Sequence, residues 1–231
     1  MPSICEPETR KPSASGGLRR MPVALYNPIR HWESRSCVAI LLEKLSMALI
    51  LFNKPYQVMC QFSRHPTRPT LADFIQRPGI YPAGRLDADS EGLMLLTDDG
   101  QLQHRISHPE RKVIKTYIAQ VEGIPDPGSL NKLRQPIDLG DFTTLPCGAT
   151  HIHAPDWLWP REPAIRQRAD TPTSWLSIRI SEGKNRQVRR MTAAVGLPTL
   201  RLIRIAIGKI SLESHPLWPG DWREISVDAL S

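Results

Sequence analysis

The amino-acid sequence predicts an α+β protein with a mixed, mainly antiparallel central sheet and short flanking helices. Apolar residues alternate with polar ones in several segments, which is the pattern of strands with one buried face. The helical stripes are short, and Gly or Pro follows them. Strand patterns outnumber helical patterns and do not alternate regularly with them, which argues against a doubly wound fold.

The folded domain is predicted to span residues 47–231. Residues 1–46 are rich in Ser, Pro and Arg and show no hydrophobic periodicity before residue 38, so we expect a disordered extension that ends, at most, in a short helix. The run from Met47 to Phe52 is the first convincing strand. Translation from Met47 is therefore one possibility, which N-terminal sequencing of the native protein would test.

Two short helices are expected in the first half of this domain. Thr70 stands where an N-cap residue is favoured, and the apolar stripe after it stops at Pro78. The turn at residues 97–100 leads into a second helix, with Leu102 and Ile106 on its inner face.

A strand expected over residues 113–121 places a charged residue and a phenol on one face. Lys115 and Tyr117 lie two residues apart, so an extended backbone directs both side chains to the same side of the sheet. These two side chains are therefore candidates for one common site.

The segment 155–163 contains three prolines and two tryptophans and is too irregular for a helix or strand. It can clamp RNA by stacking and charge, or it can be a loop that the tryptophans hold against the core. The second interpretation is slightly favoured.

The last part of the chain is predicted to form a strand, a helix and two further strands. Residues 176–180 alternate as a strand, and Asn185 is placed to cap a helix that runs to Val195. Strands over residues 199–207 and 209–212 then complete the sheet.

Composition argues against several classes of protein. No apolar run reaches the roughly 20 residues of a membrane-spanning helix, and the first residues lack the apolar core of an export signal, so we expect a cytoplasmic protein. The 4 cysteines stand singly, without the paired spacing of a zinc site or a disulfide framework. His104 with His108, and His151 with His153, lack a third ligand, so we expect no metal ion.

The formal net charge of +7 is concentrated in one segment. Residues 179–209 contain eight Lys and Arg against one Glu, which leaves the rest of the chain neutral. Arg186, Arg189 and Arg190 would share one flank of the expected helix. Such a segment indicates a surface that binds a polyanion, above all nucleic acid, although a solvated basic helix gives the same pattern.

Residues 84–92, with the sequence Gly-Arg-Leu-Asp-Ala-Asp-Ser-Glu-Gly, form the most informative motif. They place Arg85 and Asp87 on a tight turn directly before an apolar run that the protein would bury. A carboxylate beside a hydrophobic interior loses much hydration free energy unless a cation accompanies it. The motif fits a catalytic carboxylate and a structural salt bridge equally well.

Four segments, in this order, resemble the A-type RNA pseudouridine synthases that are named for the small ribosomal subunit. They are residues 84–93, Lys115-Thr116-Tyr117, residues 182–191 and residues 202–208. Residues 53–56, 155–168, 172–176 and 198–204 further resemble the branch of the family that acts on the large ribosomal subunit. Two departures from the wider family are shared with that branch: residues 1–46 cannot form the S4-type module of many members, and Gln57 replaces a common glycine.

The resemblance implies the pseudouridine synthase fold, with a cleft, and the isomerisation of a specific uridine in ribosomal RNA, for which 23S rRNA is the expected substrate. This reaction breaks the N1–C1′ bond, turns the base and rejoins it through C5, so no cofactor is expected. Asp87 is implied to be the essential carboxylate, either as nucleophile or as the base that takes a sugar proton. Both roles need an ionised carboxylate with a cation within about 4–6 Å.

The resemblance also implies roles for other residues. Arg189 would pair with Asp87, and Tyr117 would stack on the target base and assist proton removal at C5. Leu202 would form an apolar floor beneath the base. The remaining expected substrate-binding residues are Arg85, Lys115, Lys184, Arg186, Arg190 and Arg204.

Three alternatives remain open at this point. A non-catalytic rRNA-binding protein explains the basic segment but not the turn with Arg85 and Asp87. A nucleosidase or glycosylase uses a similar carboxylate but releases free base, and a synthase of this family can instead act on 16S rRNA or tRNA. We expect RNA as the partner and a monomer without a stable protein partner, because the sequence shows no heptad repeat or self-pairing edge.

Overall fold

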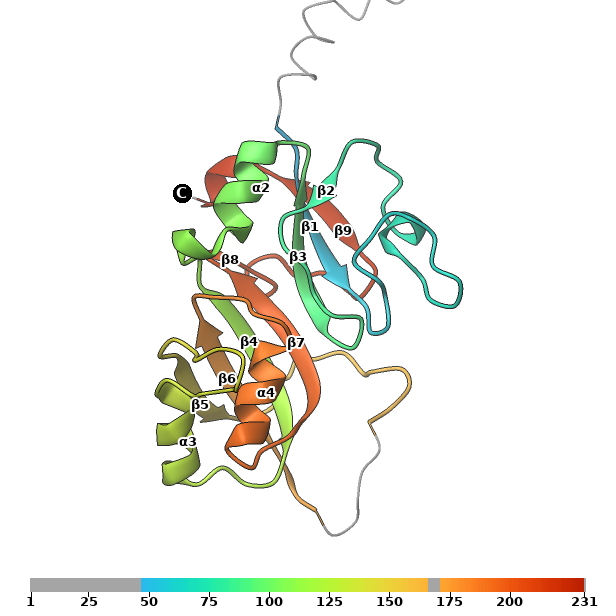
Figure 1. Ribbon diagram of the computed structural model, residues 1–231. Helices are drawn as coiled ribbons and strands as arrows, with labels where there is room; N and C mark the ends of the chain where they lie inside the picture. The colour runs from blue at the N-terminus through green and yellow to red at the C-terminus, as the bar shows by residue number, and fades with distance from the viewer. Residues whose placement is uncertain (1–46, 166–170, 231) are drawn as a thin grey trace, which may run out of the picture. The chain divides into compact units, whose positions relative to one another are not determined.

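The computed structural model of the protein describes residues 47–165 and 171–230 (Figure 1). Within them the elements are β1 (Leu49–Lys54), η1 (Leu71–Asp73), β2 (Tyr81–Pro82), β3 (Glu91–Thr97), α2 (Gly100–Ser107), η2 (Pro109–Arg111), β4 (Lys115–Glu122), α3 (Pro127–Arg134), β5 (Gly148–Ile152), β6 (Thr173–Ile180), α4 (Gln187–Ala194), β7 (Thr199–Ile207), β8 (Ile210–Ser211), β9 (Trp222–Ile225) and η3 (Val227–Leu230). The extension predicted over residues 1–46 lies outside the described residues. In the described part of the chain, no helix has the length and apolar character to cross a membrane.

The strands of the described residues form one nine-stranded sheet in the order β5-β6-β4-β7-β3-β1-β9, with β2 paired to β3 and β8 paired to β7. Neighbouring strands run antiparallel, except that β3 and β7 pair in parallel. This mixed, mainly antiparallel sheet with short helices confirms the predicted α+β class. The strands expected over residues 47–52, 113–121, 176–180 and 199–207 correspond to β1, β4, β6 and β7.

The parallel contact between β3 and β7 is unusually close. Gly92 lies opposite Arg204, and a Cβ atom added to Gly92 would come within 2.3 Å of the Arg204 carbonyl oxygen. Gly92 also has a φ of +103°, a conformation that glycine adopts without steric cost. This glycine therefore allows the loop that precedes β3 to lie directly beside β7.

The core explains the continuous apolar runs in β1, residues 49–52, and in β3, residues 93–96. Every residue of both strands is buried, because layers of side chains cover both faces of the sheet here. Phe52 and Met94 pack in the layer that contains side chains of η1, α3 and α4, whereas Leu51 and Leu95 pack in the layer that contains α2. Figure 1 shows α4 lying over β4 and β7.

The turn into α4 differs from the prediction. The helix begins at Gln187, and Arg186 occupies the N-cap position in the left-handed region, with φ of 49° and no side-chain cap hydrogen bond. The Gln187 side chain accepts a hydrogen bond from the Lys184 N–H at 3.0 Å and donates one to buried Glu182 at 2.5 Å. These contacts close the turn, so the expectation that Asn185 caps the helix was wrong.

The sequence does not predict β2, α3, β5 or β9. α3 has a clear N-cap, since the Asp126 carboxylate accepts from the Ser129 N–H at 2.7 Å, but Leu133 is its one buried residue. β9 pairs with β1 by backbone hydrogen bonds while most of its side chains remain exposed. Neither element therefore carries a hydrophobic period that identifies it.

Candidate active site

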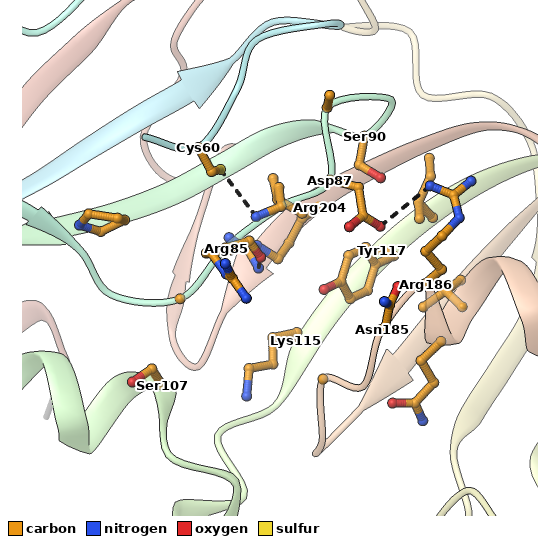
Figure 2. Close-up of a pocket in the computed structure, with 18 of the residues that line it drawn as sticks. Cys60, Arg85, Asp87, Ser90, Ser107, Lys115, Tyr117, Asn185, Arg186 and Arg204 are labelled. Carbon is orange, nitrogen blue, oxygen red and sulfur yellow. Dashed lines mark hydrogen bonds and ion pairs between the residues drawn. The ribbon is translucent and has the colours of Figure 1, made fainter. Parts of the chain in front are cut away.

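A cavity of about 1060 Å³ opens between the loop of residues 84–90, strands β4 and β7, and the turn before α4. This volume lies at the upper end of the range of about 300–1,000 Å³ that is usual for ligand pockets. Of the ten predicted site residues, eight line it: Arg85, Asp87, Lys115, Tyr117, Lys184, Arg186, Leu202 and Arg204. Figure 2 shows side chains from the loop, from β4 and from the turn before α4 pointing into this space.

The loop presents Asp87 to the cavity because the residue before it points inward. Leu86 is buried, and its N–H donates to the Cys60 sulfur at 3.3 Å. The neighbouring side chains of Arg85 and Asp87 therefore both reach the cavity, as expected for an extended segment. The Asp87 carboxylate is 42% exposed and thus accessible to a ligand.

Lys54 is a buried cation that fixes the same loop from the other side. Its ammonium group donates to the carbonyl oxygens of Pro55 and Val58, each at 2.9 Å, and of Ala88 at 3.3 Å. The Gln57 N–H donates to the Ala88 carbonyl as well, at 2.7 Å. Burial lowers the pKa of Lys54 from 10.5 to about 8, and neighbouring acidic groups offset this effect only in part.

The cations near Asp87 are arranged differently from the prediction. Nη1 of Arg186 lies 3.9 Å from Oδ2 of Asp87, while the same guanidinium binds both oxygens of Asp89 at 3.0 and 2.8 Å. Nε of Arg189 lies 3.5 Å from the Asp89 carboxylate, and its Nη2 donates to the Asp89 carbonyl at 2.7 Å. The expected pair of Arg189 with Asp87 is therefore replaced by a pair with Asp89, because Arg186 projects from the N-cap toward the loop.

Arg190 lies on another side of α4. It pairs with the Asp141 carboxylate, donates to the Leu139 carbonyl and lies 5.0 Å from the centre of the Phe142 ring. Arg189 and Arg190 do not line the cavity. The expectation that Arg186, Arg189 and Arg190 share one flank is thus wrong for Arg190: Arg186 lies at the N-cap and not in the helix, and Arg190, one position after Arg189, faces Asp141.

The floor of the cavity is apolar. Tyr117 on β4 and Leu202 on β7 are 8% and 5% exposed, and both line the space that Asp87 faces. Lys115 lies on the same face of β4 as Tyr117, as predicted, and also lines the cavity. A flat base can pack against this floor while its sugar lies toward the carboxylate.

Arg204 is a buried cation beneath the cavity. It is 4% exposed, and its Nε donates to the Leu93 carbonyl at 2.8 Å, whereas its Nη2 is buried without a hydrogen-bond partner. Among the described residues no carboxylate pairs with it. Burial, together with the charge of Arg204, lowers the pKa of Lys115. The positive charges of Lys115 and of Arg204, whose Nη2 has no hydrogen-bond partner, favour an anionic ligand in this cavity.

The basic segment does not form one surface. Arg201 on β7 is buried in a bidentate ion pair with Glu91, at 2.8 Å for each contact, and donates to the Trp159 carbonyl at 3.0 Å. The Trp159 indole N–H in turn donates to Glu91 at 2.9 Å. This network confirms that Trp159 holds its loop against the core, whereas Trp157 remains 43% exposed. Arg201 is therefore structural rather than part of an RNA-binding face.

The comparison with known proteins identifies the family that carries such a site. A model of the RNA pseudouridylate synthase family matches residues 48–194. The chain belongs to this family. Asp87, Tyr117 and Arg189 lie within the matched residues, while Leu202 and Arg204 follow them on β7.

Several members of the family align with most of the length of this chain. "Ribosomal large subunit pseudouridine synthase E" of Xanthomonas campestris pv. campestris is 54% identical over 177 residues, which are 76% of this chain and 94% of that protein. The protein of the same name from Vibrio vulnificus is 46% identical over 230 residues, which are 97% of each chain. A crystal structure of a pseudouridylate synthase superposes with a TM-score of 0.64 at 29% identity and covers 80% of this chain and 73% of that chain.

These matches confirm the resemblance to RNA pseudouridine synthases that the four motifs indicate. The small-subunit label of the predicted type is not supported, because the relatives are named for the large subunit. Among the described residues, no group of three His, Cys, Asp or Glu side chains is arranged to hold a metal ion.

Sequence reasoning missed Asp89, which lines the cavity, and the buried charges of Lys54 and Glu91, which support the structure around it. Lys54 ends a buried strand and Glu91 begins one, and a charged residue in such a run needs a partner. That signal was available in the sequence. Asp89 carries none, since an acidic residue in a turn is usually solvated.

Proposed function

We propose that the protein converts a uridine of 23S rRNA to pseudouridine, with Asp87 as the essential carboxylate. The observation that carries the proposal is the accessible Asp87 carboxylate, fixed on the loop of residues 84–90, facing the buried floor of Tyr117 and Leu202. The names of the relatives support the large-subunit substrate. We further propose a cytoplasmic monomer without a stable protein partner.

In the proposed reaction a uridine leaves its stack, at a cost of a few kcal/mol, and its base enters the cavity. The base packs on Tyr117 and Leu202, and the cations Lys115 and Arg204 receive a phosphate, which offsets part of that cost. Arg85, Lys184 and Arg186 lie at the cavity to contact the RNA backbone.

The chemical step begins at the sugar. Asp87 attacks C1′ as a nucleophile or removes a sugar proton as a base, and the N1–C1′ bond breaks in either case. The base turns within the cavity and C5 bonds to C1′; in the nucleophilic route this breaks the Asp87–C1′ bond, and in the other route Asp87 returns the proton to the sugar. The proton on C5 leaves with the assistance of Tyr117, and N1 gains a proton. Product and substrate are isomers, so the reaction balances without a co-reactant.

The proposal is tested with unmodified transcripts of 23S rRNA, 16S rRNA and tRNA. Each is incubated with the protein, carbodiimide-dependent reverse-transcription stops are mapped, and released uracil is measured. We expect one new stop in 23S rRNA and no uracil. Free uracil would identify a glycosylase, and a stop in 16S rRNA or tRNA would assign a different substrate. If neither a stop nor uracil appears, the protein is a non-catalytic RNA-binding protein.

Asp87→Asn is the matched variant, because it removes the charge and keeps the shape of the side chain. It should abolish turnover and leave the affinity for 23S rRNA nearly unchanged, since RNA affinity depends mainly on phosphate contacts. Retained turnover in this variant would refute the role of Asp87.

A further inference from the structure

Asp89 lies two residues after Asp87 and binds two arginines of the α4 region at once. The Arg186 guanidinium meets both carboxylate oxygens, at 3.0 and 2.8 Å, and Nε of Arg189 lies 3.5 Å from the same group. Burial alone would raise the pKa of Asp89, but the hydrogen bond from Arg186 and the charges of both arginines hold it below its usual range. Asp89 is therefore charged at neutral pH and fully engaged with these cations.

Asp87 shares one of these cations at a longer distance. Nη1 of Arg186 lies 3.9 Å from the Asp87 carboxylate, which is beyond hydrogen-bond distance but close enough for electrostatic attraction (Figure 2). The bidentate contact with Asp89 uses the fork of the guanidinium. The lone pairs of Asp87 on this side thus remain unoccupied by Arg186.

We propose that Asp89 is a positioning residue that holds Arg186 away from Asp87. This inference rests on the proposed function, since it concerns the availability of the Asp87 oxygens to the sugar. With Asp89 charged, Arg186 stabilises the ionised Asp87 from a distance. Without that charge, the nearest carboxylate left for the Arg186 fork is Asp87, and a direct bidentate pair would occupy the oxygens that the reaction requires.

The backbone around Arg186 is fixed independently of Asp89, so only the Arg186 side chain would move from Asp89 to Asp87. Arg186 is held in the left-handed conformation by the turn that Glu182 and Gln187 close, so its Cα position does not depend on Asp89. The link between α4 and the loop also survives loss of the carboxylate, because Arg189 donates to the Asp89 carbonyl oxygen and to the Thr199 carbonyl. Asp89→Asn therefore changes the charge that Arg186 sees and leaves the other contacts in place.

The test measures single-turnover rate and RNA affinity for Asp89→Asn, Arg186→Gln and the double variant, on unmodified 23S rRNA. We expect Asp89→Asn to lose at least about tenfold in turnover with an unchanged or tighter dissociation constant. The double variant should turn over faster than Asp89→Asn and as fast as Arg186→Gln alone, because it lacks the Arg186 cation that would otherwise bind Asp87. A structural role for Asp89 does not produce such recovery.

Asp141→Asn is the matched control, because it removes the carboxylate partner of another arginine on α4, Arg190, which does not line the cavity. Its turnover should equal that of the unchanged protein. Asp89→Glu serves as the conservative variant, and it should keep most of the turnover because it retains the charge. Urea denaturation reports whether each variant is folded.

Turnover of Asp89→Asn within about twofold of the unchanged protein would overturn the inference, and so would losses that multiply in the double variant. If Asp89→Asn does not fold, Asp89→Glu decides, and a folded Asp89→Glu as inactive as Asp87→Asn would refute the positioning role. The proposed function fails separately, if the unchanged protein makes no pseudouridine or if Asp87→Asn remains active.

Discussion

Glu91→Gln should destabilise the protein by about 3–5 kcal/mol, the cost of leaving one partner of a buried ion pair unpaired. The side chains of Glu91 and Arg201 are 2% and 6% exposed, so water cannot replace the lost charge. One oxygen of Glu91 accepts from Nε of Arg201, and the other accepts from Nη2 of Arg201 and the Trp159 indole, at 2.8–2.9 Å. Every one of these partners is a donor, so the amide nitrogen of Gln faces a donor in either orientation.

Urea denaturation at neutral pH measures this loss, provided that the slope with denaturant stays constant. Glu224→Gln is the matched control: Glu224 also pairs with an arginine, Arg77, but the two side chains are 44% and 35% exposed. An exposed pair contributes about 1 kcal/mol at most. Equal losses for the two variants, or a loss below about 1 kcal/mol for Glu91→Gln, would refute the assignment of Arg201 to a structural network.

Three further predictions follow from single residues. Burial lowers the pKa of Lys54 to about 8, so the unfolded chain binds the Lys54 proton more tightly than the folded protein does. The free energy of unfolding, measured by urea denaturation, should therefore rise by about 2 kcal/mol between about pH 7.5 and 9.5. The Lys54→Met variant should not show this rise. Gly92→Ala should cost at least about 3 kcal/mol by the same method, because its Cβ would meet backbone at 2.3 Å, whereas Gly79→Ala, with φ of +76° and no atom within 4 Å, should cost about 1 kcal/mol. Arg204→Met should weaken RNA binding and reduce its dependence on salt by about one phosphate contact, while Arg179→Met, outside the cavity, should not change this slope.

Much of the fold follows from local patterns that this sequence states clearly. The alternation around Tyr117 and the continuous run after Gly92 identify β4 and β3, because burial on one or both faces selects these residue types. The N-cap of α2, where Asp99 accepts from the Leu102 N–H, is equally visible. β9 is not, because it is held by backbone hydrogen bonds to β1 and its exposed side chains carry no period.

The candidate site shows the same division. Asp87 and Tyr117 belong to motifs that resemble a known family, and their shared cavity was expected. The partner of each arginine was not predictable in this way, because it depends on which distant loop packs against each side of α4. Arg186 at the N-cap and Arg189 in the first turn meet Asp89, whereas Arg190, about 100° further around α4, meets Asp141.

The most direct test of the central claim compares the unchanged protein with Asp87→Asn on one 23S rRNA transcript under single-turnover conditions. Pseudouridine and free uracil are quantified after nuclease digestion, and RNA affinity is measured in the same buffer. We predict pseudouridine without uracil for the unchanged protein, and unchanged affinity without pseudouridine for the variant. Pseudouridine formation by Asp87→Asn at a rate within about tenfold of the unchanged protein would contradict the account.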